Sequence, residues 1–462
     1  MVGKQFEFED QRDGIVPPLE EKKVIDEVYT DNDVASEEIV KDWDDKEEGK
    51  LRRKIDIILI PILALAFFGL QIDRGNISAA LTSTITEDLG VTTNQINIGT
   101  QLLSAGIVIT EIPSNIILQR IGPQVWLSAQ LIAWGLVGTF QAFVQSYPAY
   151  LATRLLLGLL EGGFIPGALY YLSTWYKRPE TSFRTTLFFY GQMFAGATSS
   201  LISAGLLKLD GKCGLAGWRW IFLVEGLITI FAAILFILFI PKKAGDGSPL
   251  ISMGRWSYFS PREKRIILDR VLLDDPLKTR EHIKITGRDI WKTVTQTTTL
   301  QHMLITLVAM SGFQGLNTYT PSMIKSFGFS AVRANALASV PVYASIVWTT
   351  ILAYSSDKIG HRGPFVLLCI TWNVISMHVL NVGWLSFYCK TPQERSISMA
   401  LIVMSANLSG ISGAQIFRSS DAPLYIHGLT AICALAAASW VQTLVLNLQY
   451  LFRRKKTQAG TV

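Results

Sequence analysis

The sequence contains little cysteine, little histidine and few charged residues. Of its 462 residues, 4 are cysteine and 5 are histidine, and 17% are charged. The cysteines are scattered without paired or metal-ligand spacing, which argues against a disulfide framework and a zinc site. The isolated histidines supply neither a nucleophile with its base nor a metal cluster. We therefore expect no metal, no cofactor and no enzymatic activity.

Apolar residues are abundant and are gathered into long runs. Hydrophobic residues make up 49% of the chain, and most runs are about as long as the ~20 residues that a helix needs to cross a bilayer. This pattern predicts an all-α polytopic membrane protein. The net charge of +6 comes from basic residues that lie mainly at the ends of apolar runs, where they orient spans in a membrane. We expect a lipid bilayer as a partner, and no nucleic acid.

The chain divides into five predicted parts. Residues 1–50 are acidic and poor in aromatic residues, which predicts a disordered tail. They lack a signal-peptide pattern, so the first span is expected to act as an uncleaved anchor. An N-terminal helical half over 51–241, a central loop over 242–299, a C-terminal helical half over 300–451 and a basic tail over 452–462 follow. Basic residues before the first run and in the last tail predict that both termini are cytoplasmic.

The two helical halves differ in their number of apolar runs. The N-terminal half has six, at about 55–78, 95–118, 124–145, 148–172, 184–207 and 219–241. The C-terminal half has five, at about 300–320, 334–355, 364–386, 397–417 and 427–451. Eleven crossings cannot leave both termini on one side of the membrane. The run at 364–386 has flanks of cytoplasmic character on both sides. It is therefore either a re-entrant hairpin, or the C-terminal half is one span short.

The fourth run carries two charged residues at bilayer depth. On a continuous helix Arg154, Gly158 and Glu161 share one face, and Ile165 extends that face by another turn. A charge at this depth costs ~2.5 kcal/mol or more, so it needs a partner or a water-filled cavity. We therefore predict a functional site on this face. The alternative is that Arg154 snorkels to the headgroups while Glu161 only joins neighbouring helices.

The central loop contains a predicted surface helix. In SPREKRIILDRVLLDD, Ser260, Pro261 and Glu263 match an N-cap, a first-turn proline and a capping-box acid. Its basic residues are expected on a solvated face, with anionic lipid as an alternative contact. These residues are Arg262, Lys264, Arg265 and Arg270.

Several motifs together carry a family resemblance. They are IDRGNIS, EIPSNIILQRIGP, RLLLGLLEGGFIPG, STWYKRPETSFR and GWRWIFLVEG, then NVGWLSFYCKTPQERSISMAL and IFRSSDAPLYIHG. The layout of the chain resembles the major facilitator superfamily, whose fold has two six-helix halves. The motifs resemble its anion:cation symporter family, and within it the fungal allantoate permease branch. The resemblance covers nearly all of residues 51–451.

This resemblance implies roles for four charged residues. In relatives, an Asp-Arg pair in the first span and an Arg and a Glu in the fourth span serve organic-anion binding and proton coupling. Substrate binding therefore falls to Arg74 and Arg154, and proton coupling falls to Glu161 first and Asp73 second. The chemistry fits, because a guanidinium binds a carboxylate bidentately and a buried carboxylate can gain or lose a proton as an arginine moves.

Further residues are assigned from the loops and the seventh span. Asn317 and Tyr319 lie in FQGLNTYTP, where glycine and proline can break a helix around a substrate, so both are predicted substrate contacts. Helix packing explains the glycines about as well. The superfamily's Gly/Asp/Arg-rich cytoplasmic turn matches SSDKIGHRG, and a degenerate copy lies in SNIILQRIGPQ. The resemblance thus implies a gating latch that involves Arg120, Asp357 and Arg362.

Two other acidic residues in apolar runs receive ordinary interpretations. For Glu111 we favour a structural role over a cavity group or a partner of Arg120. Glu225, with Trp218 and Trp220 in GWRWIFLVEG, is interpreted as part of a set of interface anchors and gating contacts.

These observations predict a secondary active transporter. We expect proton-coupled symport of a small carboxylate-bearing solute, such as allantoate, nicotinate or pantothenate, by alternating access. The partners would be the organic anion, protons and lipid, and the protein is expected to be a monomer in the plasma membrane. A non-transporting sensor or an inactive paralogue remains an alternative because the C-terminal half is short.

Overall fold

The computed structural model describes residues 41–252, 255–274, 287–359, 392–421 and 425–459, together with 381, 384, 385 and 389. The chain separates into two compact units, Met1–Asp42 and Trp43–Val462. Almost everything described belongs to the second unit, which is built from long helices. Its only described β pairing is an isolated bridge between Pro241 and Pro249.

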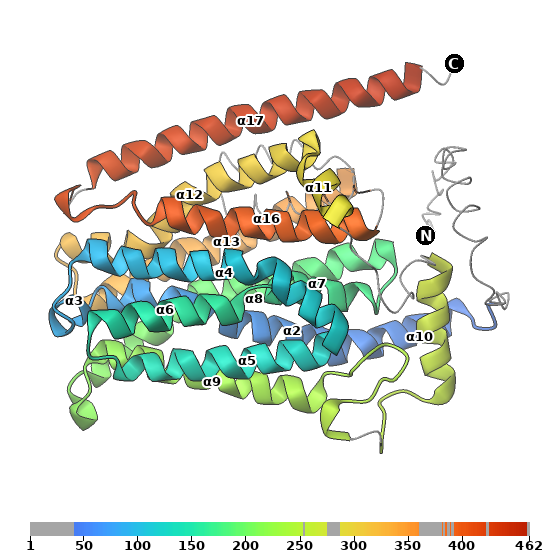
Figure 1. The fold of residues 1–462 in the computed structure, drawn as a ribbon, viewed down its shortest axis with the longest axis horizontal. Helices are drawn as coiled ribbons and strands as arrows, with labels where there is room; N and C mark the ends of the chain where they lie inside the picture. The colour runs from blue at the N-terminus through green and yellow to red at the C-terminus, as the bar shows by residue number, and fades with distance from the viewer. Residues whose placement is uncertain are drawn as a thin grey trace, which may run out of the picture. The chain divides into compact units, whose positions relative to one another are not determined.

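The first part of this unit contains helices that run along a common direction (Figure 1). Their bounds are α2 (Asp45–Ala80), α4 (Thr93–Ile121), α5 (Pro123–Phe140), α6 (Tyr147–Glu161), α7 (Phe164–Ser173), α8 (Arg178–Leu206) and α9 (Gly217–Phe239). Short elements connect them, namely α3 (Ile85–Asp88) and the 3₁₀ turns η1 (Gln141–Phe143), η2 (Leu207–Leu209) and η3 (Lys212–Gly214).

The central and later parts contain fewer described helices. In the central loop and just after it lie η4 (Leu250–Ser252), α10 (Pro261–Asp274) and α11 (Gly287–Val294). The long helices that follow are α12 (Thr297–Ser326), α13 (Ala331–Ile359), α16 (Pro392–Gly413) and α17 (Ile426–Ala459), with η6 (Ser419–Asp421) before the last.

Ten of the eleven predicted apolar runs coincide with these helices, counting α6 and α7 as one run. The eleventh, 364–386, lies almost entirely outside the described residues, so the number of spans in the C-terminal half stays a prediction. By length and composition, six helices in the described part qualify as membrane spans. Both α8 and α12 fall outside this group, and both carry polar side chains that line an internal cavity. The polar residues of α8 and α12 are therefore explained by their position in the cavity wall.

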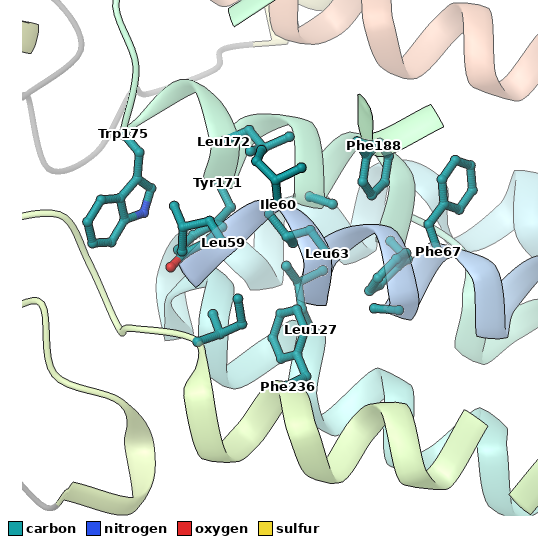
Figure 2. Packing of buried hydrophobic residues seen from close by; sticks show 14 of the residues in the cluster. Leu59, Ile60, Leu63, Phe67, Leu127, Tyr171, Leu172, Trp175, Phe188 and Phe236 are labelled. Carbon is teal, nitrogen blue, oxygen red and sulfur yellow. The ribbon is translucent and has the colours of Figure 1, made fainter. Parts of the chain in front are cut away.

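The largest hydrophobic core lies around α2. Phe67 of α2 stacks on Phe188 of α8 with ring centroids 4.5 Å apart and planes 9° from parallel. Figure 2 shows how side chains from α2, α5, α7, α8 and α9 meet there. The labelled residues are Leu59, Ile60, Leu63, Phe67, Leu127, Tyr171, Leu172, Trp175, Phe188 and Phe236. This core fixes the direction in which α2 presents its polar residues one to two turns later.

The fourth predicted span is broken. α6 ends at Glu161, and Gly163 has φ 81° before α7 begins. A residue without Cβ adopts this left-handed conformation at little cost. The backbone N–H of Gly163 donates to Glu111 Oε2 at 3.1 Å, so this donor is paired at the break. This contact supports the structural role that we favoured for Glu111.

The break changes one prediction about this span. A single helical face extending from Arg154 past Glu161 to Ile165 is wrong, because the helix stops at Glu161. The pair Gly162-Gly163 was the available signal for a break. The result is that Glu161 occupies the last position of α6.

The predicted helix of the central loop is present and capped as expected. α10 begins at Pro261, the Ser260 N–H donates to Glu263 Oε2 at 2.8 Å, and the Glu263 N–H donates to Ser260 Oγ at 3.2 Å. These two reciprocal bonds form a capping box.

The basic residues of α10 do not all lie on a solvated face. Arg270 is fully buried, its Nη1 lies 3.3 Å from a Glu180 carboxylate oxygen, and its Nη2 donates to the Trp175 carbonyl at 2.9 Å. The solvated-face prediction is therefore wrong for Arg270. It holds for Arg265, whose side chain is 69% exposed. A buried ion pair thus attaches α10 to the start of α8.

A close approach of α4 and α6 depends on glycine. A Cβ added to Gly158 would lie 2.1 Å from the Leu103 carbonyl oxygen, and one added to Gly106 would lie 2.9 Å from the Leu155 carbonyl oxygen. Both neighbours are backbone atoms and cannot move aside independently of their helices. Gly158 therefore sets how closely the helix that carries Arg154 and Glu161 packs on α4.

We expect Gly158→Ala to destabilise the protein. Separating two packed helices costs about 1–3 kcal/mol, which would appear as a lower apparent Tm of the purified protein in detergent. Gly205→Ala is the control, because a Cβ there meets nothing within 4 Å. An unchanged Tm for Gly158→Ala would contradict the close approach.

Candidate functional site

An internal cavity of about 190 Å³ lies between helices of the two predicted halves. Polar side chains from both halves contribute to its wall, and among the described residues the charged members of the lining are Arg74 and Arg154. The polar lining residues from the N-terminal part are Gln71, Ser78, Thr100, Ser104, Gln192, Ser199 and Ser200. Those from the C-terminal part are Gln314, Asn317, Thr318 and Asn407. Because its charged lining groups are both cationic, the cavity suits an anion.

Arg74 of α2 connects the two predicted halves. Its Nε donates to Glu161 Oε2 at 2.6 Å, and its Nη1 donates to Asn407 Oδ1 of α16 at 3.3 Å. The exposed fraction of the side chain is 19% for Arg74 and 0% for Glu161. Arg74 therefore meets the cavity, while its carboxylate partner lies behind it.

Arg154 of α6 also lines the cavity, but it lacks a carboxylate partner. Its Nη2 donates to Asn76 Oδ1 at 3.3 Å, and the guanidinium lies over the rings of Tyr150 and Phe222 at 5.5 and 5.4 Å. Within the described part of the chain, no carboxylate oxygen lies at ion-pair distance, and Nε has no hydrogen-bond partner. An almost fully buried guanidinium with unused donors is prepared to bind an anion.

Glu161 is the last residue of α6, directly before the break in the fourth span. Its Oε2 accepts from Arg74, whereas Oε1 is buried without a partner among the described residues. Arg154 and Glu161 therefore do not pair with each other, although both belong to α6. The alternative in which Arg154 snorkels to the headgroups is wrong, because its side chain is buried and lines the cavity.

Asp73 lies behind the cavity wall. Its Oδ2 accepts from Thr229 Oγ1 of α9 at 2.9 Å, and a Cβ on Gly138 of α5 would lie 3.4 Å from its Oδ1. Asp73 is fully buried and is not part of the lining. The adjacent residues Asp73 and Arg74 thus point to different surroundings.

Of the two residues in the seventh span that were predicted to contact substrate, Asn317 lines the cavity and Tyr319 does not. Asn317 lines the cavity, and its carbonyl accepts from Ser78 Oγ at 3.2 Å. Tyr319 lies outside the lining, donates its hydroxyl to Asn97 of α4, and packs against Phe417 with ring centroids 5.3 Å apart.

Tyr319 belongs to a set of contacts that join the predicted halves where α2 ends and α4 begins. Asn97 Nδ2 donates to the Phe417 carbonyl at 3.3 Å. Lys325 Nζ donates to the Thr82 carbonyl at 2.8 Å, and Asn335 Nδ2 donates to Thr82 Oγ1 at 2.9 Å. We call these contacts the Asn97 closure.

The predicted latch is only partly visible. Arg120 is exposed in the last turn of α4. The side chain of Asp357 and the whole of Arg362 lie outside the described residues, so the latch stays a prediction.

Comparison with known proteins identifies the family. The sequence model of the Major Facilitator Superfamily matches residues 63–420. The chain belongs to this superfamily.

Individual relatives are more distant. The chain is 25% identical over 444 residues to an uncharacterized transporter of Saccharomyces cerevisiae, with 89% of this chain and 82% of that protein covered. It is 28% identical over 402 residues to a protein of Agrobacterium vitis named "Putative tartrate transporter", with 86% and 81% covered. It is 25% identical over 461 residues to a major facilitator-type transporter of Emericella nidulans, with 90% and 89% covered.

Solved structures agree on the fold. A xylose transporter from E. coli matches with a TM-score of 0.53 and 13% identity over 85% of this chain and 90% of that one. A nucleoside transporter matches with a TM-score of 0.57 and 12% identity over 84% and 98%. The chain therefore has the fold of a polytopic major facilitator protein, and its relatives are transporters.

Some cavity residues of this major facilitator protein were not found from sequence. Asn407 and Ser199 line the cavity, and Asn76 accepts a hydrogen bond from Arg154. Single polar residues in apolar runs were the only signal, and they resemble those used for helix packing. The partner of Glu161 was missed for another reason, because the contact between Arg74 and Glu161 joins residues 87 positions apart.

We expect Tyr319→Phe to loosen the Asn97 closure. Losing one hydrogen bond of about 1 kcal/mol should raise the open population roughly fivefold. The readout is labelling of a cysteine placed at Ser78, in a background without native cysteines, by a membrane-impermeant maleimide. Tyr147→Phe is the control, since the Tyr147 hydroxyl bonds to Gln95 within the same predicted half. Equal labelling rates with and without Tyr319→Phe would contradict the role of Tyr319 in closure.

Proposed function

We propose that this protein is a proton-coupled symporter of a small carboxylate-bearing solute. The observation that carries the proposal is the pair of arginines in the cavity lining, of which Arg154 lacks a carboxylate partner among the described residues. A guanidinium is the side chain best suited to bind a carboxylate through two parallel hydrogen bonds. The proposal includes import across the plasma membrane by a monomer, with both termini in the cytoplasm.

The size of the cavity favours a small substrate. A cavity of about 190 Å³ has room for a compact organic acid. The name of the Agrobacterium vitis relative points to the same size class. Tartrate is therefore the first probe to test, followed by nicotinate and allantoate.

The proposed coupling uses competition for Arg74. Arg74 Nε donates to Glu161 in this structure. A substrate carboxylate that binds Arg154 and reaches Arg74 would weaken this ion pair. A buried carboxylate without its cation is costly, so Glu161 is expected to take up a proton when substrate binds. Substrate and proton would then move together.

Asn407 provides a way to transmit this event to the C-terminal part. Its Oδ1 accepts from Arg74 Nη1, and its own Nδ2 donates to the Val403 carbonyl within α16. A shift of the Arg74 side chain would therefore change a contact between α2 and α16. Alternating access requires such a difference in contacts between states.

We expect Arg154→Lys to bind substrate much more weakly. Lysine keeps the charge but loses the planar pair of donors, and a charged hydrogen bond contributes about 1.5–3 kcal/mol. The KM for labelled tartrate should rise by roughly 10- to 100-fold, measured by uptake at acidic external pH in cells lacking endogenous permeases.

The control for this experiment is Arg333→Lys, because Arg333 is exposed at the start of α13. Normal uptake by Arg154→Lys would contradict the assignment of Arg154. Wild-type protein that signals but accumulates none of the three acids would favour the alternative of a membrane sensor.

We expect Glu161→Gln to separate transport from proton coupling. Glutamine preserves the size of the side chain but cannot titrate. The variant should still exchange external for internal tartrate, while accumulation driven by a pH gradient is lost. Glu87→Gln, at an exposed position of α3, should accumulate normally. Undiminished pH-driven accumulation by Glu161→Gln would exclude Glu161 as the proton carrier.

A further inference from the structure

A second acidic residue is connected to the cavity from another side. Glu225 lies in α9 about two turns from Trp218, the residue that we grouped with it at the membrane interface. Its side chain is fully buried. The interpretation of Glu225 as an interface anchor is therefore wrong. A buried acid within a span needs another explanation.

The hydrogen bonds of Glu225 are one-sided. Ser199 Oγ and Ser203 Oγ, one turn apart on α8, both donate to Glu225 Oε1, at 3.1 and 3.2 Å. Oε2 is buried and has no partner in the described structure. The carboxylate faces both serine hydroxyls with Oε1, so a proton passed along either hydrogen bond reaches that oxygen.

The serine pair leads to the cavity. Ser199 lines the cavity, whereas Ser203 is fully buried. Gly75 of α2, another lining residue, lies opposite, and a Cβ placed there would be 3.7 Å from Ser199 Oγ. The Ser199 hydroxyl thus both hydrogen-bonds to Glu225 and belongs to a residue of the cavity lining. A hydroxyl both donates and accepts, so it can pass a proton.

The charged groups around Glu225 include one acid and one base. α9 packs against α2, α5 and α8, and of these α2 presents Asp73, whose Oδ2 bonds to Thr229 one turn after Glu225. α5 contains no charged residue, and α8 presents the two serines. From α6, the guanidinium of Arg154 lies over Phe222, one turn before Glu225.

Other charged groups near α9 lie at its first turns. Lys208 of η2 is exposed, and Asp88 of α3 accepts from Trp218 Nε1 at 2.6 Å. No ion pair to Glu225 is present among the described residues. The acid nearest to it along these contacts is Asp73, which bonds to Thr229 on the same helix.

We propose that Glu225 is a second proton-carrying site that exchanges protons with the cavity through Ser199. A hydronium in the cavity gives one proton to the Ser199 hydroxyl and becomes water, while Ser199 passes its own proton to the carboxylate. The reverse transfer releases the proton. This inference rests on the proposed symport and adds to it, because a second proton allows a dianion to be carried without net charge movement. The two cavity arginines suit such a substrate.

The test uses purified protein in liposomes with labelled tartrate, membrane potential clamped at zero and a gradient of about one pH unit. At equilibrium each coupled proton multiplies the accumulation ratio about tenfold per pH unit. Glu225→Gln should therefore lower the ratio about tenfold relative to wild type, and Glu225→Asp should restore it. Ser199→Ala should slow pH-driven uptake but leave the equilibrium ratio unchanged.

The controls separate this proposal from the proposed function. Glu87→Gln should match wild type. If wild-type protein shows no accumulation, the symport itself fails. If wild type accumulates and Glu225→Gln gives the same ratio, only the role of Glu225 is overturned. A lower accumulation ratio in Asp73→Asn, with a wild-type ratio in Glu225→Gln, also overturns the role of Glu225. Should Glu225→Gln not fold, a wild-type ratio of about tenfold, meaning one coupled proton, overturns the role of Glu225.

Discussion

The ion pair between Arg74 and Glu161 is the interaction on which the site depends. It places one full charge of each sign inside a helical membrane protein, at 2.6 Å. Breaking a buried pair on one side is strongly destabilising, since it leaves an uncompensated charge. The pair can therefore change only when another anion or a proton replaces what is lost. In the proposed mechanism, this requirement would link occupancy of the cavity to the protonation of Glu161 through side-chain movements alone.

The geometry of the chain around this pair follows from two local features. The break at Gly163 ends α6 at Glu161, so the carboxylate sits at the C-terminus of that helix, while the Gly163 N–H at the start of α7 donates to Glu111. The glycine at position 158 lets α6 approach α4 closely. Both features use glycine to set backbone positions, and both hold the charged end of α6 against the wall of the cavity. The aromatic core around Phe67 fixes α2 on the opposite side.

Much of the helical layout could be predicted from sequence, whereas the pairing of charges could not. Long apolar runs bounded by basic residues locate helices because burial in lipid and backbone hydrogen bonding both require them. The capping box of α10 is local and was also readable. The partner of a buried charge depends on rotation and tilt of helices far apart in sequence. Periodicity placed Arg154 and Glu161 on one helical face but could not show that Glu161 pairs with Arg74, while Arg154 lines the cavity.

The contrast between neighbours on α2 explains why proximity in sequence was a poor guide to role. Asp73 faces Thr229 of α9 and Gly138 of α5. Arg74 faces the cavity and reaches α16. Successive residues on a helix are rotated by about 100°, so one polar motif serves two surfaces. The surface with Asp73 and Glu225 lies within the N-terminal part, and the surface with Arg74 touches both parts. Only the second surface contacts both parts, so in the proposed transport cycle Arg74 is the residue that would couple substrate binding to relative motion of the two parts.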